Sequence, residues 1–499
     1  MGIRISSIYR QQTVVENIGK LDVGEFELQL FDSRYMLKKT EITKRKWNGW
    51  IKPSCIPITI IFILIVLVVM LPLLEQKQED KVYVLADTGN CTEPCWVTLV
   101  ESIPENLTYS TTLNHPSTFD GWLNLIHLAE HTIDIAAFYW TLRGSDVVPD
   151  PSDWQGEKIF QELLAAGTER KIKISIVQNL PSYTQPDNDT KELEEKGAAV
   201  VRNIDFEKLI GKGILHTKMW IVDNKHFYIG SANMDWRALT QVKELGIVAY
   251  NCSCLTSDLK KIFDAYWLLS ESDHIPKPWP SYFDTVFNKT HPAIITINDT
   301  STRAYLSSSP PQFCAKGRTS DINSILSVIK TAKKFIHIAV MDYFPAIIYT
   351  KHLKYWPVID DALREAAVTR GIKIKVLASH WQHTRPIMLS FLRSLQALNS
   401  TGISIETKLF IVPTYSPSQA KIPYARVNHN KYMVTDDAAY IGTSNWSGDY
   451  FISTGGVGFI LQNSENYTNS YIQVQLQAVF ERDWFSEYAH PITEVDDIR

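Results

Sequence analysis

The chain has 499 residues, a formal net charge of −4, 45% hydrophobic residues and 21% charged residues. These proportions are those of a globular protein and exclude a largely disordered chain. The weak acidity excludes recognition of polyanions through overall charge alone, although a local basic groove remains compatible with it. The length allows two to three domains of average size.

An apolar segment, IPITIIFILIVLVVMLPLL at residues 56–74, contains no charged residue and is long enough to cross about 30 Å of hydrocarbon. A buried core helix would show a polar face, and a cleavable signal peptide would lie nearer the N-terminus. Lysines and arginines cluster before the segment and acidic residues follow it. The positive-inside rule therefore predicts a type II signal anchor, with residues 1–55 as a cytosolic tail and residues 75–95 as a lumenal stalk.

Sequons of the form Asn-x-Ser/Thr occur only after this segment, which agrees with a glycosylated lumenal region. The candidate acceptors are Asn90, Asn106, Asn188, Asn251, Asn288, Asn298, Asn399 and Asn466. A further sequon at Asn445 belongs to a motif described below, and we expect its side chain to be buried and to carry no glycan.

Four cysteines form two closely spaced pairs, Cys91 with Cys95 and Cys252 with Cys254. In an oxidising lumen these pairs could cross-link as a short ladder of disulfides. The alternative is a zinc site, for which the single residue between Cys252 and Cys254 is a tight spacing. Cys314 has no evident partner in the sequence.

Strand-like and helical patterns alternate along the chain after the stalk, and their order repeats. The first copy has a helix near 122–126, a strand at 133–140, a helix at 158–166 and strands at 172–177 and 246–250, and the second has the same elements at 322–329, 336–344, 359–367, 372–377 and 456–461. A closing helix completes each copy. Such alternation predicts an α/β fold with a largely parallel sheet.

The duplication predicts two α/β/α sandwich halves related by a pseudo-two-fold axis. The segment 271–311 is rich in Pro, Ser and Thr, as expected of a boundary between domains. We therefore predict a first half at residues 96–290 and a second half at residues 291–499.

One motif occurs once in each copy. It reads HTKMWIVD at 216–223 and HNKYMVTD at 429–436, and each version leads into a glycine-led turn that ends in Asn233 or Asn445. A single His-x-Lys tripeptide in a strand would more often be surface decoration. The same eight-residue pattern twice, inside a duplicated frame, points instead to a functional site.

The basic side chains of the two motifs suit phosphodiester chemistry. Because side chains two residues apart in a strand share a face, His216 should project with Lys218, and His429 with Lys431. A histidine with a pKa near 6.5 can act as nucleophile or acid. The lysines can hold the non-bridging phosphate oxygens. One imidazole could then attack phosphorus while the other protonates the leaving oxygen.

Four further motif residues are candidates for the site. Asn233 and Asn445 can donate hydrogen bonds to phosphate oxygens. Asp223 and Asp436 either orient or charge-balance a histidine of the opposite half or are structural, and spacing alone does not decide between these roles. No carboxylate cluster accompanies the motifs, so we predict neither a metal nor another cofactor.

Aromatic side chains at corresponding strand ends could stack the bases of a single strand, or could belong to the core and its rim. They are Phe138, Tyr139, Trp140, Tyr343 and Phe344. We expect His380 and His383, which follow a strand of the second copy, to be surface residues and not part of the catalytic machinery.

The doubled motif resembles that of the phospholipase D superfamily, in which HxKxxxxD occurs twice per active unit. Four stretches are similar more narrowly to the animal type II membrane branch that contains phospholipases D three and four: GSANMDWRALTQVKELG (230–246), YNCSC (250–254), IPYARVNHNKYMVT (422–435) and IGTSNWSGDYF (441–451). Asp436 stands where that branch often has Glu. Both histidines, lysines and asparagines are kept, which disfavours a third class of function, an inactive lumenal scaffold.

The resemblance implies an endolysosomal 5′→3′ exonuclease of single-stranded DNA and RNA that limits nucleic-acid sensing and reaches late endosomes and lysosomes through the endoplasmic reticulum and Golgi. It also implies a homodimer. In this family mechanism His216 forms a phosphohistidine, His429 protonates the leaving ribose oxygen and then activates water, and Glu244 supports the site. The alternative is phosphatidyl transfer between lysosomal phospholipids, in which an alcohol replaces water.

Overall fold

The computed structural model describes residues 66, 91, 93–183, 185, 187–464 and 471–497. Among these residues, no helix combines the length and apolarity that a bilayer crossing requires. The predicted tail, the predicted span except for Val66, and most of the stalk lie outside the described residues. The chain divides into two compact units, Met1–Lys77 and Gln78–Arg499, and the description below concerns the second.

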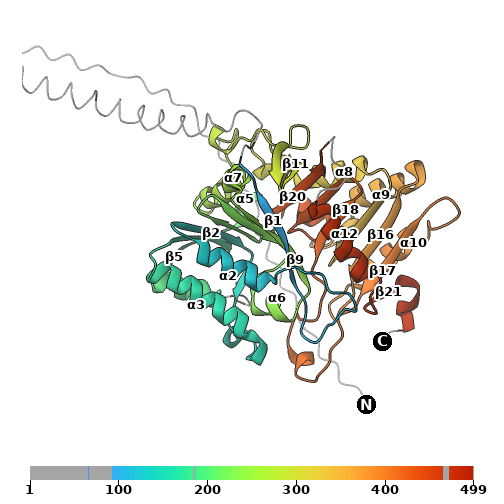
Figure 1. Ribbon diagram of the computed structural model, residues 1–499, viewed down its shortest axis with the longest axis horizontal. Coiled ribbons are helices and arrows are strands. Elements are labelled where there is room, and N and C mark those ends of the chain that lie inside the picture. Colours follow the sequence, from blue (N-terminus) through green and yellow to red (C-terminus); the bar gives the residue numbers. More distant parts are fainter. Residues whose placement is uncertain are drawn as a thin grey trace, which may run out of the picture. The chain divides into compact units, whose positions relative to one another are not determined.

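The first half is built on a seven-stranded mixed sheet with the strand order β1-β9-β7-β6-β2-β4-β5 (Figure 1). Its strands are β1 Trp96–Ser102, β2 Thr132–Ala137, β4 Lys173–Asn179, β5 Ala199–Ile204, β6 Met219–Val222, β7 His226–Gly230 and β9 Glu244–Tyr250. A short pair, β3 Trp140–Thr141 with β8 Met234–Asp235, lies apart from this sheet. The helices are α2 Thr118–Leu128, α3 Trp154–Thr168, α4 Asn188–Glu195, α5 Phe206–Ile210, α6 Trp236–Thr240 and α7 Ser253–Leu269.

The second half repeats this plan around a ten-stranded sheet. Nine of its strands have the order β10-β11-β20-β19-β18-β13-β16-β17-β21, and the tenth, β12, pairs with β11. Its strands are β10 Ala293–Ile297, β11 Thr300–Ser309, β12 Thr319–Ser320, β13 Phe335–Val340, β16 Lys373–Ser379, β17 Ile405–Phe410, β18 Lys431–Thr435, β19 Ala438–Gly442, β20 Gly456–Asn463 and β21 Ala489–Pro491, with the separate pair β14 Ala346–Ile347 and β15 Lys354–Tyr355. The helices are α8 Asp321–Thr331, α9 Val358–Arg370, α10 Pro386–Gln396, α11 Gly448–Ile452 and α12 Tyr471–Trp484.

Helices cover both faces of each sheet, so each half is a mixed α/β layered structure. In the first half α2 packs on β1, β9 and β6, and α7 packs on the opposite face and also reaches β11 of the second half. In the second half α8 packs on β11, β19 and β20, while α12 packs on β13 and β18 and reaches β1 of the first half. The two sheets also meet directly, with the rings of Phe227 and Phe459 5.7 Å apart. One hydrophobic core therefore extends across both halves.

The predicted helices and strands are present, with ends that differ by a few residues, but the prediction of a largely parallel sheet is wrong. In the two large sheets the runs β2-β4-β5 and β13-β16-β17 and the short pair β11–β12 are parallel, and the other neighbouring strands are antiparallel. The physical reason is connection length. Three residues join β6 to β7 and two join β18 to β19, whereas a parallel crossover needs about a dozen residues or more.

The four paired cysteines form two disulfides, Cys91–Cys254 and Cys95–Cys252, with Cα atoms 5.8 and 4.7 Å apart. They tie the segment before β1 to the start of α7, which confirms the predicted ladder and leaves no thiolates for the zinc alternative. Cys314 is the free cysteine within the described part of the chain.

The described sequons differ in accessibility. The side chains of Asn106, Asn188, Asn251 and Asn399 are exposed, those of Asn288 and Asn298 are half-buried, and Asn90 and Asn466 lie outside the described residues. Asn445 is buried, as expected. The Nδ2 atom of Asn298, to which a glycan would be attached, donates to the carbonyl of Val97 at 2.7 Å. That sequon is therefore poorly placed to carry a glycan.

A buried ion network joins β1, α12 and the residue before β9. Lys243 pairs with Asp483 at 2.8 Å, and Arg482 pairs with Asp483 at 2.9 Å and with Glu101 at 2.6 Å. The side chains of Lys243 and Asp483 are fully buried. Burial alone would raise the pKa of Asp483, but Lys243 and Arg482 hold that pKa below its ordinary value.

Replacing Lys243 with Met should lower the free energy of unfolding by about 3 kcal/mol, because it leaves two buried carboxylates with one cation fewer. Denaturant unfolding followed by tryptophan fluorescence measures this loss. The control is Lys158→Met, which removes a partly exposed pair with Glu162 and should change stability by less than about 1 kcal/mol. Equal losses in the two variants would contradict a structural role for the network.

Candidate active site

Backbone hydrogen bonds across the two halves position both motif histidines. The amide of His216 donates to the carbonyl of Gly455 at 2.8 Å, and the amide of Gly455 donates to Ile214 at 2.9 Å. The same exchange occurs on the other side, where His429 donates to the carbonyl of Lys243 at 2.8 Å. Each histidine is therefore held by the residue that precedes a strand of the opposite half.

Each motif lysine folds back onto its own histidine residue. The Nζ atom of Lys218 donates to the carbonyl of His216 at 2.7 Å, and the Nζ atom of Lys431 donates to the carbonyl of His429 at the same distance. Both lysine side chains are buried. The two histidine residues keep 5% and 8% of their surface, so solvent and ligands can still reach them. The predicted projection of each His-Lys pair into one site is therefore what the geometry gives.

The two imidazoles have different partners. The Nδ1 atom of His429 donates to the carboxylate of Glu244 at 2.9 and 3.0 Å from its two oxygens. The Nδ1 atom of His216 lies 2.9 Å from the backbone carbonyl of Thr443, which can only accept. His216 therefore carries its proton on Nδ1 and has a lone pair on Nε2. Glu244, which belongs to the first half, stabilises the charged form of the second half's histidine.

The difference between the partners of the two imidazoles follows from one position in the duplicated turn. The glycine-led turns run from Gly230 to Gly246 and from Gly442 to Gly458, and Glu244 in the first corresponds to Gly456 in the second. A Cβ atom at Gly456 would lie 2.4 Å from the hydroxyl of Ser444, so the packing there excludes a side chain. A second carboxylate at this position would therefore require the side chains of Ser444 and Ser309 to move.

The electrostatics of the site favour an anionic ligand. Burial, then the charges of Lys218, Lys431 and His429, lower the pKa of His216 well below its ordinary value. Burial and Lys431 also lower the pKa of Lys218 strongly. Burial lowers the pKa of His429, although Glu244 opposes the shift. Protonation of any one of these four groups therefore disfavours protonation of the others, and a bound anion would offset this repulsion.

Lys431 has a carboxylate neighbour that sequence reasoning missed. Burial lowers the pKa of Lys431 to about 7, while Glu244 and Asp342 oppose the shift. Burial in turn raises the pKa of Asp342 to about 6, which Lys431 and Arg385 oppose. Asp342 lies two residues after the end of β13, whose last residue pairs with Lys431, and this position at a strand end was the signal available in the sequence.

The two asparagines occupy equivalent places. The Nδ2 atom of Asn233 donates to the hydroxyl of Tyr139 at 3.4 Å, and the Nδ2 atom of Asn445 donates to the hydroxyl of Tyr450 at 3.0 Å. The Oδ1 atoms of both asparagines are buried without a protein hydrogen-bond partner. The ring of Tyr450 packs edge-on against His216 at 5.0 Å, so Asn445 and His216 share a neighbour that the sequence did not reveal.

The aspartates of the two motifs do not lie beside the histidines. The carboxylate of Asp223 accepts from the amides of Glu130, His131 and Thr132 at 2.7–2.8 Å. Asp223 follows the end of β6 while His216 precedes its start, roughly 23 Å away along an extended chain. Asp223 therefore does not orient a histidine, and the structural alternative is the correct one.

Asp436 makes the equivalent contacts in the second half. One carboxylate oxygen accepts from the amides of Lys333, Lys334 and Phe335 at 2.9–3.3 Å. Each aspartate thus fixes the turn that precedes the central parallel strand of its own half. The repeated spacing between histidine and aspartate reflects the length of one strand. Glu244 is the carboxylate that lies next to an imidazole.

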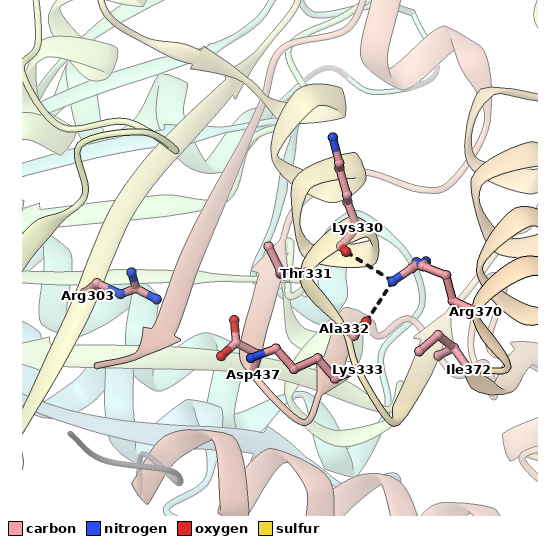
Figure 2. A pocket seen from close by; sticks show the side chains of 8 residues that line it. All are labelled: Arg303, Lys330, Thr331, Ala332, Lys333, Arg370, Ile372 and Asp437. Carbon is pink, nitrogen blue, oxygen red and sulfur yellow. Dashed lines mark hydrogen bonds between the residues drawn. The ribbon is translucent and has the colours of Figure 1, made fainter. Parts of the chain in front are cut away.

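A basic cavity of about 540 Å³ lies near this distal turn (Figure 2). It is lined by Arg303, Lys330, Thr331, Ala332, Lys333, Arg370, Ile372 and Asp437. Arg370 donates to the carbonyls of Lys330 and Ala332 at the end of α8, and Arg303 donates to the carbonyl of Asn463. These cations stabilise the ends of α8 and β20, and the cavity includes none of the predicted site residues.

Most of the predicted base-stacking aromatics are in the core. Trp140, Tyr343 and Phe344 are at most 2% exposed, so of the two alternatives the core position is correct for these three residues. Trp140 lies in the β3–β8 pair and Tyr343 donates its hydroxyl to a buried carboxylate. Phe138 and Tyr139 are half-buried, and the ring of Phe138 lies 5.4 Å from His216. His383 is exposed and His380 is half-buried, as expected of residues outside the catalytic machinery.

Comparison with known proteins supports the family resemblance. Residues 110–415 match the family model described as "PLD3/4, PLD-like domain". The chain is 48% identical over 457 residues to 5'-3' exonuclease PLD3 of Xenopus laevis, covering 90% of this chain and 92% of the relative. It is 44% identical over 408 residues to 5'-3' exonuclease PLD4 of Mus musculus, covering 79% of each.

Among solved structures, phosphatidylserine synthase of Haemophilus influenzae Rd KW20 has a similar fold. The TM-score is 0.52 at 12% identity, covering 75% of this chain and 86% of that one. This likeness concerns the fold alone. The fold and the paired histidines define a phosphodiesterase assembled from two homologous halves. The chain belongs to the phospholipase D superfamily, in the branch of PLD3 and PLD4.

Replacing Asp223 with Asn should lower the free energy of unfolding by about 1–3 kcal/mol, because one acceptor oxygen is lost from a turn with three amide donors. The kcat/KM of the folded enzyme should change less than about twofold. Thermal unfolding and phosphodiesterase kinetics measure the two effects. Asp299→Asn, an exposed substitution between β10 and β11, is the control. A large loss of kcat at unchanged stability would restore a catalytic role to Asp223.

Proposed function

We propose that the protein is a lumenal 5′→3′ exonuclease of single-stranded DNA and RNA that acts through a phosphohistidine intermediate. The observation that carries this proposal is the convergence of two His-Lys pairs, one from each half, on a single site. The curated relatives named 5'-3' exonuclease, one of them 48% identical over 90% of the chain, support the substrate. The two disulfides support an oxidising compartment such as the endolysosomal lumen.

In the first step His216 is the nucleophile. Its Nε2 lone pair is free because the Thr443 carbonyl holds the proton on Nδ1. Burial and the charges of Lys218 and Lys431 lower the pKa of His216, which favours the neutral ring. Nε2 attacks phosphorus and a P–N bond forms while the P–O bond to the leaving ribose breaks. His429, whose protonated form Glu244 and the bound anionic phosphate both favour, transfers its Nε2 proton to that oxygen.

In the second step His429 acts as a base. It removes a proton from water, the hydroxide attacks phosphorus, and the P–N bond to His216 breaks, which returns both imidazoles to their starting protonation states. Glu244 stabilises the imidazolium that forms. Lys218 and Lys431 hold the non-bridging oxygens throughout, and their charge is worth most in a site that excludes water.

A substrate whose leaving group departs without a proton distinguishes the role of the nucleophile, His216, from that of the acid and base, His429. With a p-nitrophenyl phosphodiester, His429→Asn should release a burst of about one p-nitrophenolate per enzyme and then stall. The stall is expected because hydrolysis of the phosphohistidine lacks the base that activates water. The trapped phosphoryl group should be acid-labile and located on His216 by mass spectrometry of the full chain purified in detergent.

The reciprocal variant provides the control for this experiment. His216→Asn should give no burst and no labelled protein, since it lacks the nucleophile. A burst in His216→Asn together with its absence in His429→Asn would reverse the two roles. Turnover at the wild-type rate in either variant would place the chemistry elsewhere.

The substrate is tested on the same purified full chain with single-stranded oligonucleotides labelled at the 3′ end. We expect stepwise shortening from a free 5′ end at acidic pH and no shortening when that end carries a bulky block. Vesicles of lysosomal phospholipids are assayed in parallel. Lipid turnover without oligonucleotide shortening would overturn the exonuclease proposal in favour of phosphatidyl transfer.

The pH at which Lys431 loses its charge predicts where activity falls on the alkaline side of the pH profile. Its pKa of about 7 means that Lys431 is charged below neutral pH and loses that charge as pH rises through 7. Asp342, ionised above about pH 6, supports the charged form. Asp342→Asn should therefore move the alkaline limb of the kcat/KM profile to lower pH by about one unit. The exposed control Asp361→Asn should leave the limb in place, and an unmoved limb in Asp342→Asn would contradict this electrostatic assignment.

A further inference from the structure

The loop after β16 begins at the catalytic edge of the second sheet. Val340, the last residue of β13, pairs with Lys431 on one side and with Ala378 on the other. β16 therefore ends two strands away from the start of the second motif. The loop at residues 380–385, which leads into α10, consequently emerges beside the catalytic histidine and not at the distal turn.

An aromatic contact leads from the proposed nucleophile to the protein surface. Tyr450, which packs against His216, has its ring 6.2 Å from that of Tyr349, and the two hydroxyls are 3.5 Å apart. Tyr349 is 58% exposed. The guanidinium of Arg385 lies over the ring of Tyr349 at 5.2 Å. A cation and an exposed aromatic plane therefore stand directly outside the site.

A second group of aromatic side chains includes two residues of the same loop, Trp381 and His383. The rings of His383 and Tyr424 are stacked at 4.7 Å with an interplanar angle of 22°, and Trp381 meets His383 edge-on at 4.7 Å. Tyr424 is 63% exposed and has a φ of +56°, a left-handed conformation that is rare for a non-glycine residue. Residues held in this backbone region are frequent at functional sites.

Arg385 also belongs electrostatically to the catalytic centre. Its charge acts on Asp342, and Asp342 acts on Lys431. The loop is thus coupled to the phosphate-binding lysine through one carboxylate. A phosphate held near Arg385 would lie next to the one under attack, as consecutive phosphates of a strand do.

We propose that these side chains form a binding track for the single strand outside the scissile phosphodiester. The track consists of Tyr349, Trp381, His383, Arg385 and Tyr424. Its aromatic planes stack bases and its cation contacts a backbone phosphate. This assignment rests on the proposed nuclease function and adds to it the residues that make a longer strand a better substrate.

The chemistry of the track selects a single-stranded nucleic acid as its occupant. Exposed aromatic planes stack on any unpaired base, whereas the bases of a duplex present only their edges. Aliphatic lipid chains would call for a continuous apolar face, but the track interleaves rings with a guanidinium and an imidazole. The chain's net charge of −4 provides no general attraction for polyanions, so stacking must supply much of the affinity.

The track is tested by the dependence of kcat/KM on strand length. For the wild-type full chain, kcat/KM should rise from dinucleotides to dodecanucleotides. Trp381→Ala and Tyr424→Ala should each lower kcat/KM on the dodecamer about tenfold, the value of one lost base stack. On a p-nitrophenyl phosphodiester, which is too small to reach the track, both variants should stay within about twofold of wild type.

The control is Tyr471→Ala, which removes a 54% exposed tyrosine at the start of α12. Two residues further on, Gln473 donates to the carbonyl of Thr435 at the distal end of β18. It should behave as wild type on every substrate. Trp381→Phe and Tyr424→Phe retain a ring and should recover most of the lost activity, which separates stacking from misfolding.

Three results would overturn the track, and each is distinct from failure of the proposed function. They are an unchanged dodecamer rate in both alanine variants, an equal loss on the small substrate, and a wild-type rate that does not depend on length. Failure of the wild-type enzyme to cleave any oligonucleotide would instead overturn the nuclease function itself. A direct readout uses the His216→Asn background, in which 2-aminopurine fluorescence in a bound strand should be quenched by stacking and recover in Tyr424→Ala.

Discussion

The exchange of backbone hydrogen bonds between the two halves is the constraint on which the site depends. His216 is held by Gly455 and His429 by Lys243, so each histidine is positioned by the half to which it does not belong. The side-chain partners cross in the same way, since Thr443 serves His216 and Glu244 serves His429. Neither half contains a complete site, and the shared core that holds the sheets together is therefore also a condition for chemistry.

Duplication alone would give two equivalent histidines, whereas a two-step transfer needs a nucleophile and an acid. The difference comes from one pair of corresponding positions, occupied by Glu244 and Gly456. A carboxylate favours an imidazolium and a backbone carbonyl favours a neutral ring with a defined tautomer. Pairs of titratable groups whose environments separate their pKa values are the usual signature of acid and base assignments. Here the close packing of Gly456 against Ser444 maintains that separation.

The sequence predicted the doubled motif, the order of elements and the projection of each His-Lys pair, because these depend on short-range periodicity. It did not decide the role of Asp223, whose partners at 130–132 lie some ninety residues earlier in the chain. It also failed to separate buried from exposed aromatics. Trp140 is covered by a strand pair formed with Met234, and the stack of His383 on Tyr424 joins two loops that only the fold brings together.

The buried lysines explain why an anion should complete the site. Lys218 and Lys431 repel each other away from bulk water, and Glu244 and Asp342 offset only part of that cost. A bound phosphodiester adds negative charge among these groups and raises the pKa of each neighbouring cation and imidazole. Glu244 already favours protonation of His429 and no carboxylate does so for His216, so the proton taken up on binding goes to His429. In the proposed mechanism, substrate binding would therefore charge His429 while leaving His216 neutral, which are the protonation states that the first step needs.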